Sequence, residues 1–206
     1  MSVEPIRDRR SERRQATIDE ILETAWRLAR VEGLAGLSLR ELAAEVGMRP
    51  QSLYSYFDSK HDIYDAMFAA GYRQLLARQA EWEMVGEPHA DVRTMADTFI
   101  GFCTEDPVRY QLLFQRTIPG FEPSPESFTL AVQCLDVTVA QLAELGIDDP
   151  RHIDLFTAIG TGLTDQQISN DPGGDRWTRL IDDATAMFLH HVSSSTPATR
   201  SRRKRP

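Results

Sequence analysis

The sequence predicts an all-α fold of about nine helices. Three observations support this prediction. Apolar residues recur at helical spacing along most of the chain. No stretch alternates apolar and polar residues for long enough to indicate a sheet. Prolines and glycines separate the periodic segments, as they do where one helix ends and the next begins.

The first predicted helix carries one apolar stripe and ends near two glycines. Gly33 and Gly36 mark its end and the loop that follows. The stripe consists of Ile18, Ile21, Leu22, Ala25, Trp26, Leu28 and Ala29.

Two short helices are predicted next, at residues 38–46 and 50–57. Ser38 and Glu41 have the spacing of a capping box, in which the serine accepts from the amide three residues on. Gly47 is suited to the left-handed conformation that ends the first of these helices.

Apolar residues predict that the two short helices pack together. Leu42 and Val46 of the first face Leu53 and Phe57 of the second, and Pro50 suits the second helix's first turn. Two short helices joined by a glycine-containing turn form the helix-turn-helix pattern, whose second helix fits the major groove of DNA.

The outer face of the second short helix is polar and has no carboxylate. Its arginine and glutamine can pair with guanine and adenine edges, and its hydroxyls can hold phosphates. Spacing alone leaves a second interpretation open, namely two amphipathic helices with an ordinary polar surface. The residues of this face are Arg49, Gln51, Ser52, Tyr54, Ser55 and Tyr56.

Further helices are expected along the rest of the chain, with loops at 120–125 and 171–175. The helix after the short pair starts at a second capping signal, Ser59 to Asp62. The expected ranges are 60–82, 90–104, 107–117, 125–145, 150–169 and 175–193.

Charge is unevenly distributed over the 206 residues, whose net charge is −8. Residues 1–60 hold 10 Lys/Arg and 10 Asp/Glu, residues 61–196 hold 8 and 21, and residues 197–206 hold 5 and none. The acidic sum therefore leaves room for local nucleic-acid binding near the basic ends. No apolar run reaches the roughly 18 residues of a membrane span, so we expect no membrane partner. With two cysteines and no secretory signal at the N-terminus, we expect a cytoplasmic protein.

The segment from Thr17 to Tyr72 resembles the DNA-binding domain of the TetR family of bacterial transcriptional repressors. The similarity rests on SLRELAAEVGMRPQSLYSYFDSKHDIYDAMF, which contains Leu-Ala, then Val-Gly, then Leu-Tyr-x-x-Phe, and then Lys60. Two positions depart from the family pattern. Arg49 stands where the family has a Ser or Thr cap, and Tyr56 stands where His is frequent.

The resemblance implies a homodimeric repressor that a small molecule releases from a palindromic DNA operator. It implies four parts: a basic arm (1–14), a helix-turn-helix domain (15–72), a helical ligand-binding and dimerisation domain (73–194) and a basic disordered tail (195–206). The expected DNA-binding residues are Thr17, Ser38, Arg40, Arg49, Pro50, Gln51, Ser52, Tyr54, Ser55, Tyr56 and Lys60.

Aromatic residues in the acidic part predict a pocket for an apolar or aromatic effector, although ordinary core packing explains most of them as well. The pocket candidates are Phe99, Phe102, Cys103, Tyr110, Leu113, Phe114, Phe128, Val132 and Phe156.

Two glycines inside a helical pattern, Gly160 and Gly162, predict close helix approach. The resemblance places a four-helix dimer interface there; a bent helix or room for a ligand are the alternatives. The interface candidates are Ile159, Gly160, Gly162, Leu163, Ile168, Trp177, Leu180, Ala184 and Phe188.

No catalytic arrangement is evident, so an enzyme is not predicted, and neither a cofactor nor a metal is expected. His190 and His191 are adjacent and point to different faces of a helix, and no phosphate-binding or dinucleotide motif is present. The remaining alternative is a helical small-molecule-binding or interaction protein that does not bind DNA.

Overall fold

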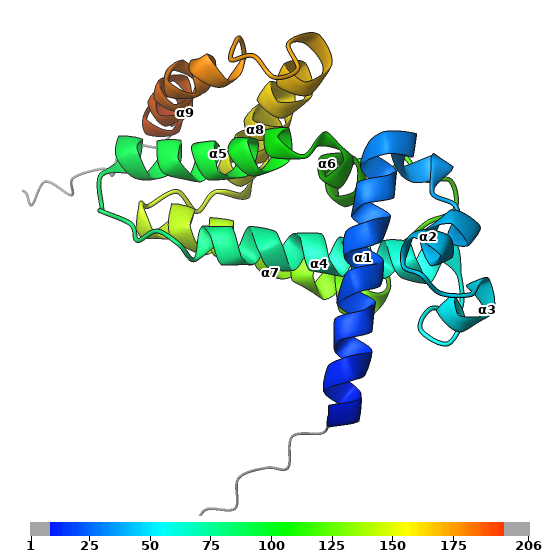
Figure 1. The fold of residues 1–206 in the computed structure, drawn as a ribbon. Coiled ribbons are helices and arrows are strands. Elements are labelled where there is room, and N and C mark those ends of the chain that lie inside the picture. The colour runs from blue at the N-terminus through cyan, green and yellow to red at the C-terminus, as the bar shows by residue number, and fades with distance from the viewer. Residues whose placement is uncertain (1–8, 196–206) are drawn as a thin grey trace, which may run out of the picture. The chain divides into compact units, whose positions relative to one another are not determined.

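The computed structural model describes residues 9–195, and within them every regular element is a helix, as the sequence predicts. Figure 1 shows the elements in chain order. They are α1 (Arg9–Gly36), α2 (Leu39–Glu45), α3 (Pro50–Leu53), α4 (Lys60–Gln79), α5 (Pro88–Glu105), α6 (Pro107–Phe114), α7 (Pro125–Glu144), α8 (Pro150–Asn170), the 3₁₀ helix η1 (Thr178–Leu180) and α9 (Ile181–Ser195).

The chain divides into two compact units. The first, called the N-terminal unit here, comprises residues up to Gln74 together with Asp106–Val132. The second, called the C-terminal unit, comprises Leu75–Glu105 and the residues from Gln133 onward. The N-terminal unit therefore adds α6, the loop after it and the start of α7 to the predicted helix-turn-helix segment.

Local sequence signals fix the short helices of the N-terminal unit. The Ser38 side chain accepts from the backbone N–H of Glu41 at 3.5 Å, which caps α2 as predicted. Gly47 follows α2 with a φ of 76°, the left-handed conformation expected of it. At the start of α4, Ser59 N–H donates to the Asp62 carboxylate at 2.9 Å, and Asp62 N–H donates back to Ser59 Oγ at 3.2 Å. The second capping signal is thereby confirmed.

Several contacts hold α6 inside the N-terminal unit. Asp106 caps α6 through the N–H of Arg109. The same carboxylate accepts two hydrogen bonds from Arg30 of α1, at 3.0 and 2.7 Å. On the other side, the Tyr72 hydroxyl of α4 donates to the Leu113 carbonyl at 3.1 Å. Helix α6 is thus joined to both long helices of its unit.

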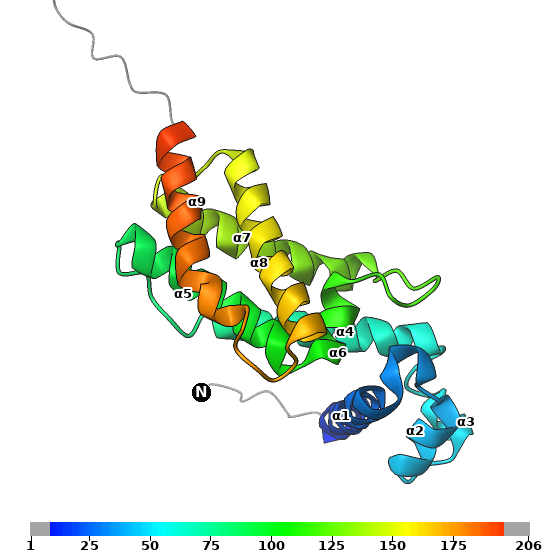
Figure 2. The ribbon, with the colours of Figure 1, turned by 90° about the horizontal axis from the view of Figure 1, so that it is seen from above.

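The C-terminal unit is built around α5, with α8 and α9 packed against it and against each other (Figure 2). Its core contains a cluster of buried apolar side chains. The cluster consists of Val92, Met95, Leu142, Ile147, Phe188 and Val192.

Several predicted boundaries differ from the structure: the helices expected at 60–82 and 107–117 end at Gln79 and Phe114, and three further differences concern the arm, α3 and the tail. Residues 9–14, expected in the arm, are the first turns of α1, while residues 1–8 lie outside the described part. Helix α3 spans only Pro50–Leu53, and turns continue to Phe57 in place of a helix ending there. The last predicted helix begins as η1 and continues as α9 to Ser195, so the rest of the predicted tail lies outside the described residues. Among residues 9–195 no helix is long and apolar enough to cross a membrane.

Candidate functional site

Two buried anchors hold the segment formed by α3 and the turn after it. Leu53 is 1% exposed and Phe57 is 8% exposed, so both point into the N-terminal unit as predicted. The residues between and before them face outward, and Tyr54 is 51% exposed. The exposed polar residues of this segment are Arg49, Gln51, Ser52, Tyr54 and Ser55. This surface carries donors and acceptors but no carboxylate.

The start of α3 has no side-chain cap. Arg49 occupies the N-cap position without accepting a hydrogen bond, because a guanidinium has no acceptor. Pro50 at the first position removes one backbone N–H that would otherwise need a partner. The Arg49 side chain therefore remains exposed and available for a ligand.

Arg14 of α1 supports the turn after α3, a contact that the sequence analysis missed. Its guanidinium donates to the Ser55 carbonyl at 3.0 Å and lies 4.8 Å from the centre of the Tyr56 ring. Tyr56 is accordingly only partly exposed. The contact joins residues 41 positions apart, so helical periodicity gives no sign of it.

Lys60 has an internal partner in this structure. Its ammonium donates to the Ala35 carbonyl at 2.9 Å and lies 5.5 Å from the centre of the Tyr64 ring. Partial burial lowers the pKa of Lys60. Lys60 thus joins the start of α4 to the end of α1.

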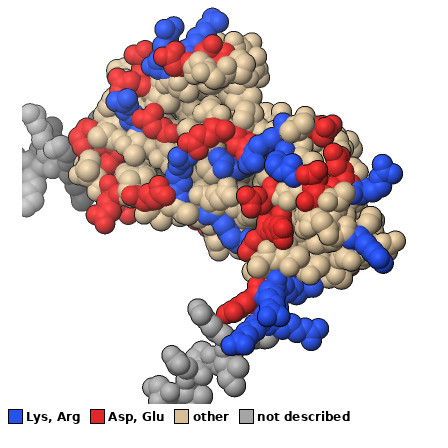
Figure 3. All heavy atoms as spheres, in the orientation of Figure 1, with Lys and Arg blue, Asp and Glu red and all other residues tan. Residues whose placement is uncertain are grey.

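The other predicted DNA-binding residues lie on α1 and α2. Thr17 is partly exposed and its hydroxyl donates to the Arg13 carbonyl at 3.0 Å. Ser38 serves as the α2 cap, and Arg40 is exposed. Figure 3 shows basic side chains gathered at the start of α1, where Arg9, Arg10, Arg13 and Arg14 stand. Residues of α1 and of the α3 turn thus combine positive charge with uncharged donors.

A cavity of about 320 Å³ lies in the same unit, between α4, α6, the loop that follows α6 and the start of α7. Its volume is at the lower end of the range typical for small-molecule sites, about 300–1,000 Å³. Five aromatic rings stand in its wall, and polar groups stand in the loop after α6. The lining residues are Phe68, Tyr72, Leu112, Leu113, Phe114, Gln115, Arg116, Thr117, Ile118, Phe121, Glu122, Pro123 and Phe128.

The cavity collects three of the nine predicted pocket residues, Leu113, Phe114 and Phe128. Tyr110 is buried beside it, with its ring 5.6 Å from that of Phe114. Val132 is 43% exposed and does not line the cavity. The contribution of Phe68 and Tyr72 was not predicted from the sequence, although their four-residue spacing on α4 places both on one face of that helix.

The other predicted pocket residues belong to the C-terminal unit. Phe102 and Cys103 are buried in α5, at 2% and 0% exposure. Phe99 lies against Gly160, so the close helix approach expected at that glycine occurs between α8 and α5 of one chain. Burial raises the pKa of the second cysteine, Cys134, to about 12.

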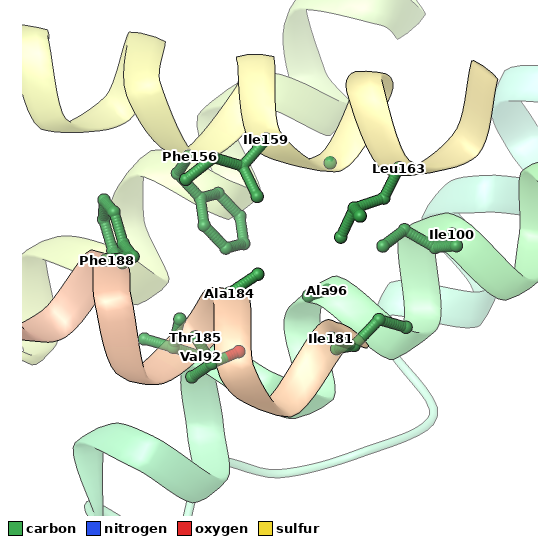
Figure 4. A pocket seen from close by; sticks show the side chains of 11 residues that line it. Val92, Ala96, Ile100, Phe156, Ile159, Leu163, Ile181, Ala184, Thr185 and Phe188 are labelled. Atoms are coloured by element: carbon green, nitrogen blue, oxygen red, sulfur yellow. The ribbon is translucent and has the colours of Figure 1, made fainter. Parts of the chain in front are cut away.

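Phe156 lines a gap between α5, α8 and α9, where side chains from all three helices point toward one another (Figure 4). The volume of this gap is about 10 Å³. Such a space holds about one water molecule, which excludes it as a site for an effector.

The predicted interface residues divide between the interior and the surface. Five of them line the small gap: Ile159, Gly160, Leu163, Ala184 and Phe188. Ile168, Trp177 and Leu180 are partly exposed, and Gly162 is exposed with open space around it. Next to these positions, Met187 of α9 presents an apolar side chain that is 72% exposed.

Potential metal ligands do not cluster in the described part of the chain: no three His, Cys, Asp or Glu side chains there are arranged to hold an ion. His152 and His191 do approach each other, with ring centres 5.7 Å apart in an edge-to-face arrangement. Two imidazoles alone do not complete the four-ligand shell that zinc sites require.

Comparison with known proteins finds a family match in the helix-turn-helix region. Residues 21–67 match the family model described as bacterial regulatory proteins, tetR family. The match lies within the helix-turn-helix region and spans α2, α3 and the start of α4. The resemblance seen between Thr17 and Tyr72 is thereby confirmed.

Similarity to TetR-family regulators extends beyond that region. The HTH-type transcriptional repressor Rv1353c of Mycobacterium tuberculosis is 25% identical over 213 residues, covering 94% of this chain and 76% of that protein. The HTH-type transcriptional repressor DrrR1 of Streptomyces coeruleorubidus is 45% identical over 51 residues, covering 25% of this chain and 19% of that protein. The homologues are thus transcriptional regulators.

The fold as a whole also matches solved structures. The putative regulatory protein SCO4313 has a TM-score of 0.73 at 21% identity, covering 87% of this chain and 98% of that chain. The similarity covers 87% of the chain, so it includes residues of both units.

Proposed function

We propose that the protein is a DNA-binding transcriptional regulator, acting as a repressor that a small apolar or aromatic effector releases from a palindromic operator. The observation that carries the proposal is the exposed, carboxylate-free polar face of α3 and its turn, anchored by Leu53 and Phe57. It stands in a region that matches the TetR family. The relatives include proteins named as transcriptional repressors, which favours repression over activation of transcription.

The exposed side chains have separable roles in this proposal. Gln51 and Arg49 contact base edges, because an amide and a guanidinium can each make two hydrogen bonds to one base. Tyr54 and the basic start of α1 contact phosphates, which adds affinity without selecting sequence. Arg14 positions the turn through Ser55 and Tyr56 and keeps the face in one orientation.

A homodimer is part of the proposal, because a palindromic operator requires two DNA-binding domains about 34 Å apart. The outward faces of α8 and α9 are suited to the contact. Gly162 leaves open space for a second helix, and Met187 offers an exposed apolar side chain. Substituting Met187→Glu places a charge in the interface, so sedimentation of the variant should show monomers where the natural protein shows dimers.

Catalysis plays no part in the proposed function, and we place the protein in the cytoplasm, where its operator is. The effector site in this proposal is the cavity of the N-terminal unit, whose volume of about 320 Å³ is enough for a small molecule. No cofactor is required for release in this scheme.

DNA binding is tested by fluorescence anisotropy with duplexes that tile the DNA flanking the gene. We expect one duplex to bind with sequence preference and with an affinity that falls steeply as salt rises. Gln51→Ala should weaken the preferred duplex about tenfold and relax its sequence preference. The control is Gln133→Ala, which removes an exposed glutamine from α7 and should leave binding unchanged. Absence of any preferred, salt-sensitive duplex would favour a helical ligand-binding protein that does not bind DNA.

A further inference from the structure

We infer that the cavity of the N-terminal unit binds an uncharged, planar aromatic compound with a hydroxyl or carbonyl group, and that Asp65 and Phe121 transmit its presence to the helix-turn-helix. The inference rests on the proposed function, because it names the effector class and the route by which the effector acts on DNA binding.

Aromatic side chains form a continuous wall on the α4 and α6 side of the cavity. The ring centres of Phe68 and Tyr72 are 4.8 Å apart, those of Tyr72 and Phe114 are 5.6 Å apart, and those of Phe68 and Phe121 are 6.5 Å apart. Tilted and edge-to-face pairs at about 4.5–7 Å are mutually attractive beyond the area they bury. An aromatic ligand extends this packing, whereas a saturated ligand of the same shape gains only the buried area.

The polar part of the cavity lies in the loop after α6. Gln115, Arg116, Thr117 and Glu122 stand there, and Arg116 and Glu122 are exposed. The formal charges of Arg116 and Glu122 cancel, so the lining of the cavity carries no net charge. Together with the glutamine amide they supply donors and acceptors, which favours an uncharged ligand with a hydrogen-bonding group.

Asp65 connects this loop to α4. Its carboxylate accepts three hydrogen bonds: from Ser124 N–H at 2.7 Å, from Ser124 Oγ at 2.9 Å and from Ser127 Oγ at 2.8 Å. Ser127 is only 6% exposed, so water replaces these bonds poorly. A displacement of the loop by a ligand is therefore transmitted to α4, which begins at the end of the helix-turn-helix segment.

Phe121 provides a second route from the same loop. Its ring centre lies 5.7 Å from that of Tyr64 and 6.0 Å from that of His61. Tyr64 in turn donates its hydroxyl to the Leu34 carbonyl, near the end of α1. A ligand that displaces Phe121 thus acts directly on Tyr64, the side chain that joins α4 to the end of α1.

The ligand class is tested on the full-length protein without DNA, by isothermal titration with 2-naphthol and with decahydro-2-naphthol. The two probes share a carbon skeleton and a hydroxyl, but only the first has aromatic rings. We expect 2-naphthol to bind about fivefold more tightly or better. Equal affinity of the two probes, or no binding of 2-naphthol, would overturn the assignment.

A pair of matched variants tests the location. Phe128 lines the cavity and is 53% exposed, while Val132 stands one turn further along α7, is 43% exposed and does not line it. Both tolerate truncation because both are already in contact with solvent. Phe128→Ala should weaken 2-naphthol binding about fivefold, and Val132→Ala should change it less than twofold. Equal effects of the two substitutions would place the ligand elsewhere.

The coupling is tested by adding 2-naphthol to the protein–DNA complex. We expect the ligand to weaken DNA binding of the natural protein, and Asp65→Asn or Ser127→Ala to bind 2-naphthol normally while losing most of that effect. Thr129→Ala is the control, since its hydroxyl donates only to the Pro125 carbonyl of its own helix. Full release from DNA in both coupling variants would overturn the route.

The two proposals fail in distinguishable ways. A DNA complex that forms normally, with no binding of 2-naphthol, overturns the cavity assignment alone. Absence of a DNA complex contradicts the proposed function and the coupling together, whereas the titrations without DNA still decide the ligand class.

Discussion

Removing the Tyr64 hydroxyl is a small change whose effect on the free energy of unfolding can be worked out from the structure. Tyr64 is 1% exposed and Leu34, whose carbonyl accepts from it, is 4% exposed. Substituting Tyr64→Phe removes the donor, and because Leu34 is buried, water cannot take the place of the lost hydroxyl. The carbonyl keeps a longer bond from Leu37 N–H at 3.3 Å, so the loss is partial. We expect the free energy of unfolding to fall by about 1–2 kcal/mol, toward the lower end of the cost of an unsatisfied buried acceptor.

Urea denaturation followed by circular dichroism measures this loss, and DNA anisotropy measures its consequence for the helix-turn-helix. Tyr72→Phe is the matched control, because its hydroxyl, about two turns further along α4, donates to the Leu113 carbonyl at 3.1 Å. Both variants should be less stable, but only Tyr64→Phe should weaken DNA binding more than about twofold. Unchanged stability and DNA affinity in Tyr64→Phe would refute the view that the Tyr64–Leu34 hydrogen bond holds α4 in position for DNA binding.

The remaining predictions concern glycines, a cysteine and pH. Gly101→Ala should raise the free energy of unfolding by about 0.5–1 kcal/mol, because a Cβ there meets nothing within 4 Å. Gly71→Ala should lower the free energy of unfolding by about 1–3 kcal/mol, because its Cβ would lie 2.9 Å from the Leu113 side chain. Thermal unfolding of the two variants tests both predictions. Burial raises the pKa of Cys134 to about 12, so the thiol of the folded protein should resist iodoacetamide at pH 8 and react once urea unfolds the chain. Burial also raises the pKa of Tyr64 from 10.0 to about 12; the unfolded chain then loses this proton first, so stability should fall between these two pH values, and less steeply in Tyr64→Phe.

Local signals in the sequence were sufficient for most of the helices. Ser38 and Ser59 cap the helices that their neighbours predicted, and Pro107, Pro125 and Pro150 each begin a helix. These signals act within a few residues, which is why they can be read without the fold. The end of α3 at Leu53 was not predicted, because Phe57 has the same inward-facing spacing whether the chain continues as helix or as turns.

The candidate site was predicted less completely, because side chains distant in sequence compose it. The aromatic content of α6 and α7 was visible, but Phe68 and Tyr72 join it only through the packing of α4. Likewise, Arg14 reaches Ser55 across 41 positions. Such contacts depend on how helices cross, and helical periodicity gives the face of a helix without naming its neighbour.

The most direct test of the central claim is the affinity for the preferred flanking duplex, compared between the natural protein and Gln51→Ala as salt is varied. We expect Gln51→Ala to lose about tenfold in affinity for the preferred duplex and much less for an unrelated duplex, with the same salt dependence. Equal affinity of the two proteins for every duplex at every salt concentration would contradict the claim that the face of α3 reads DNA.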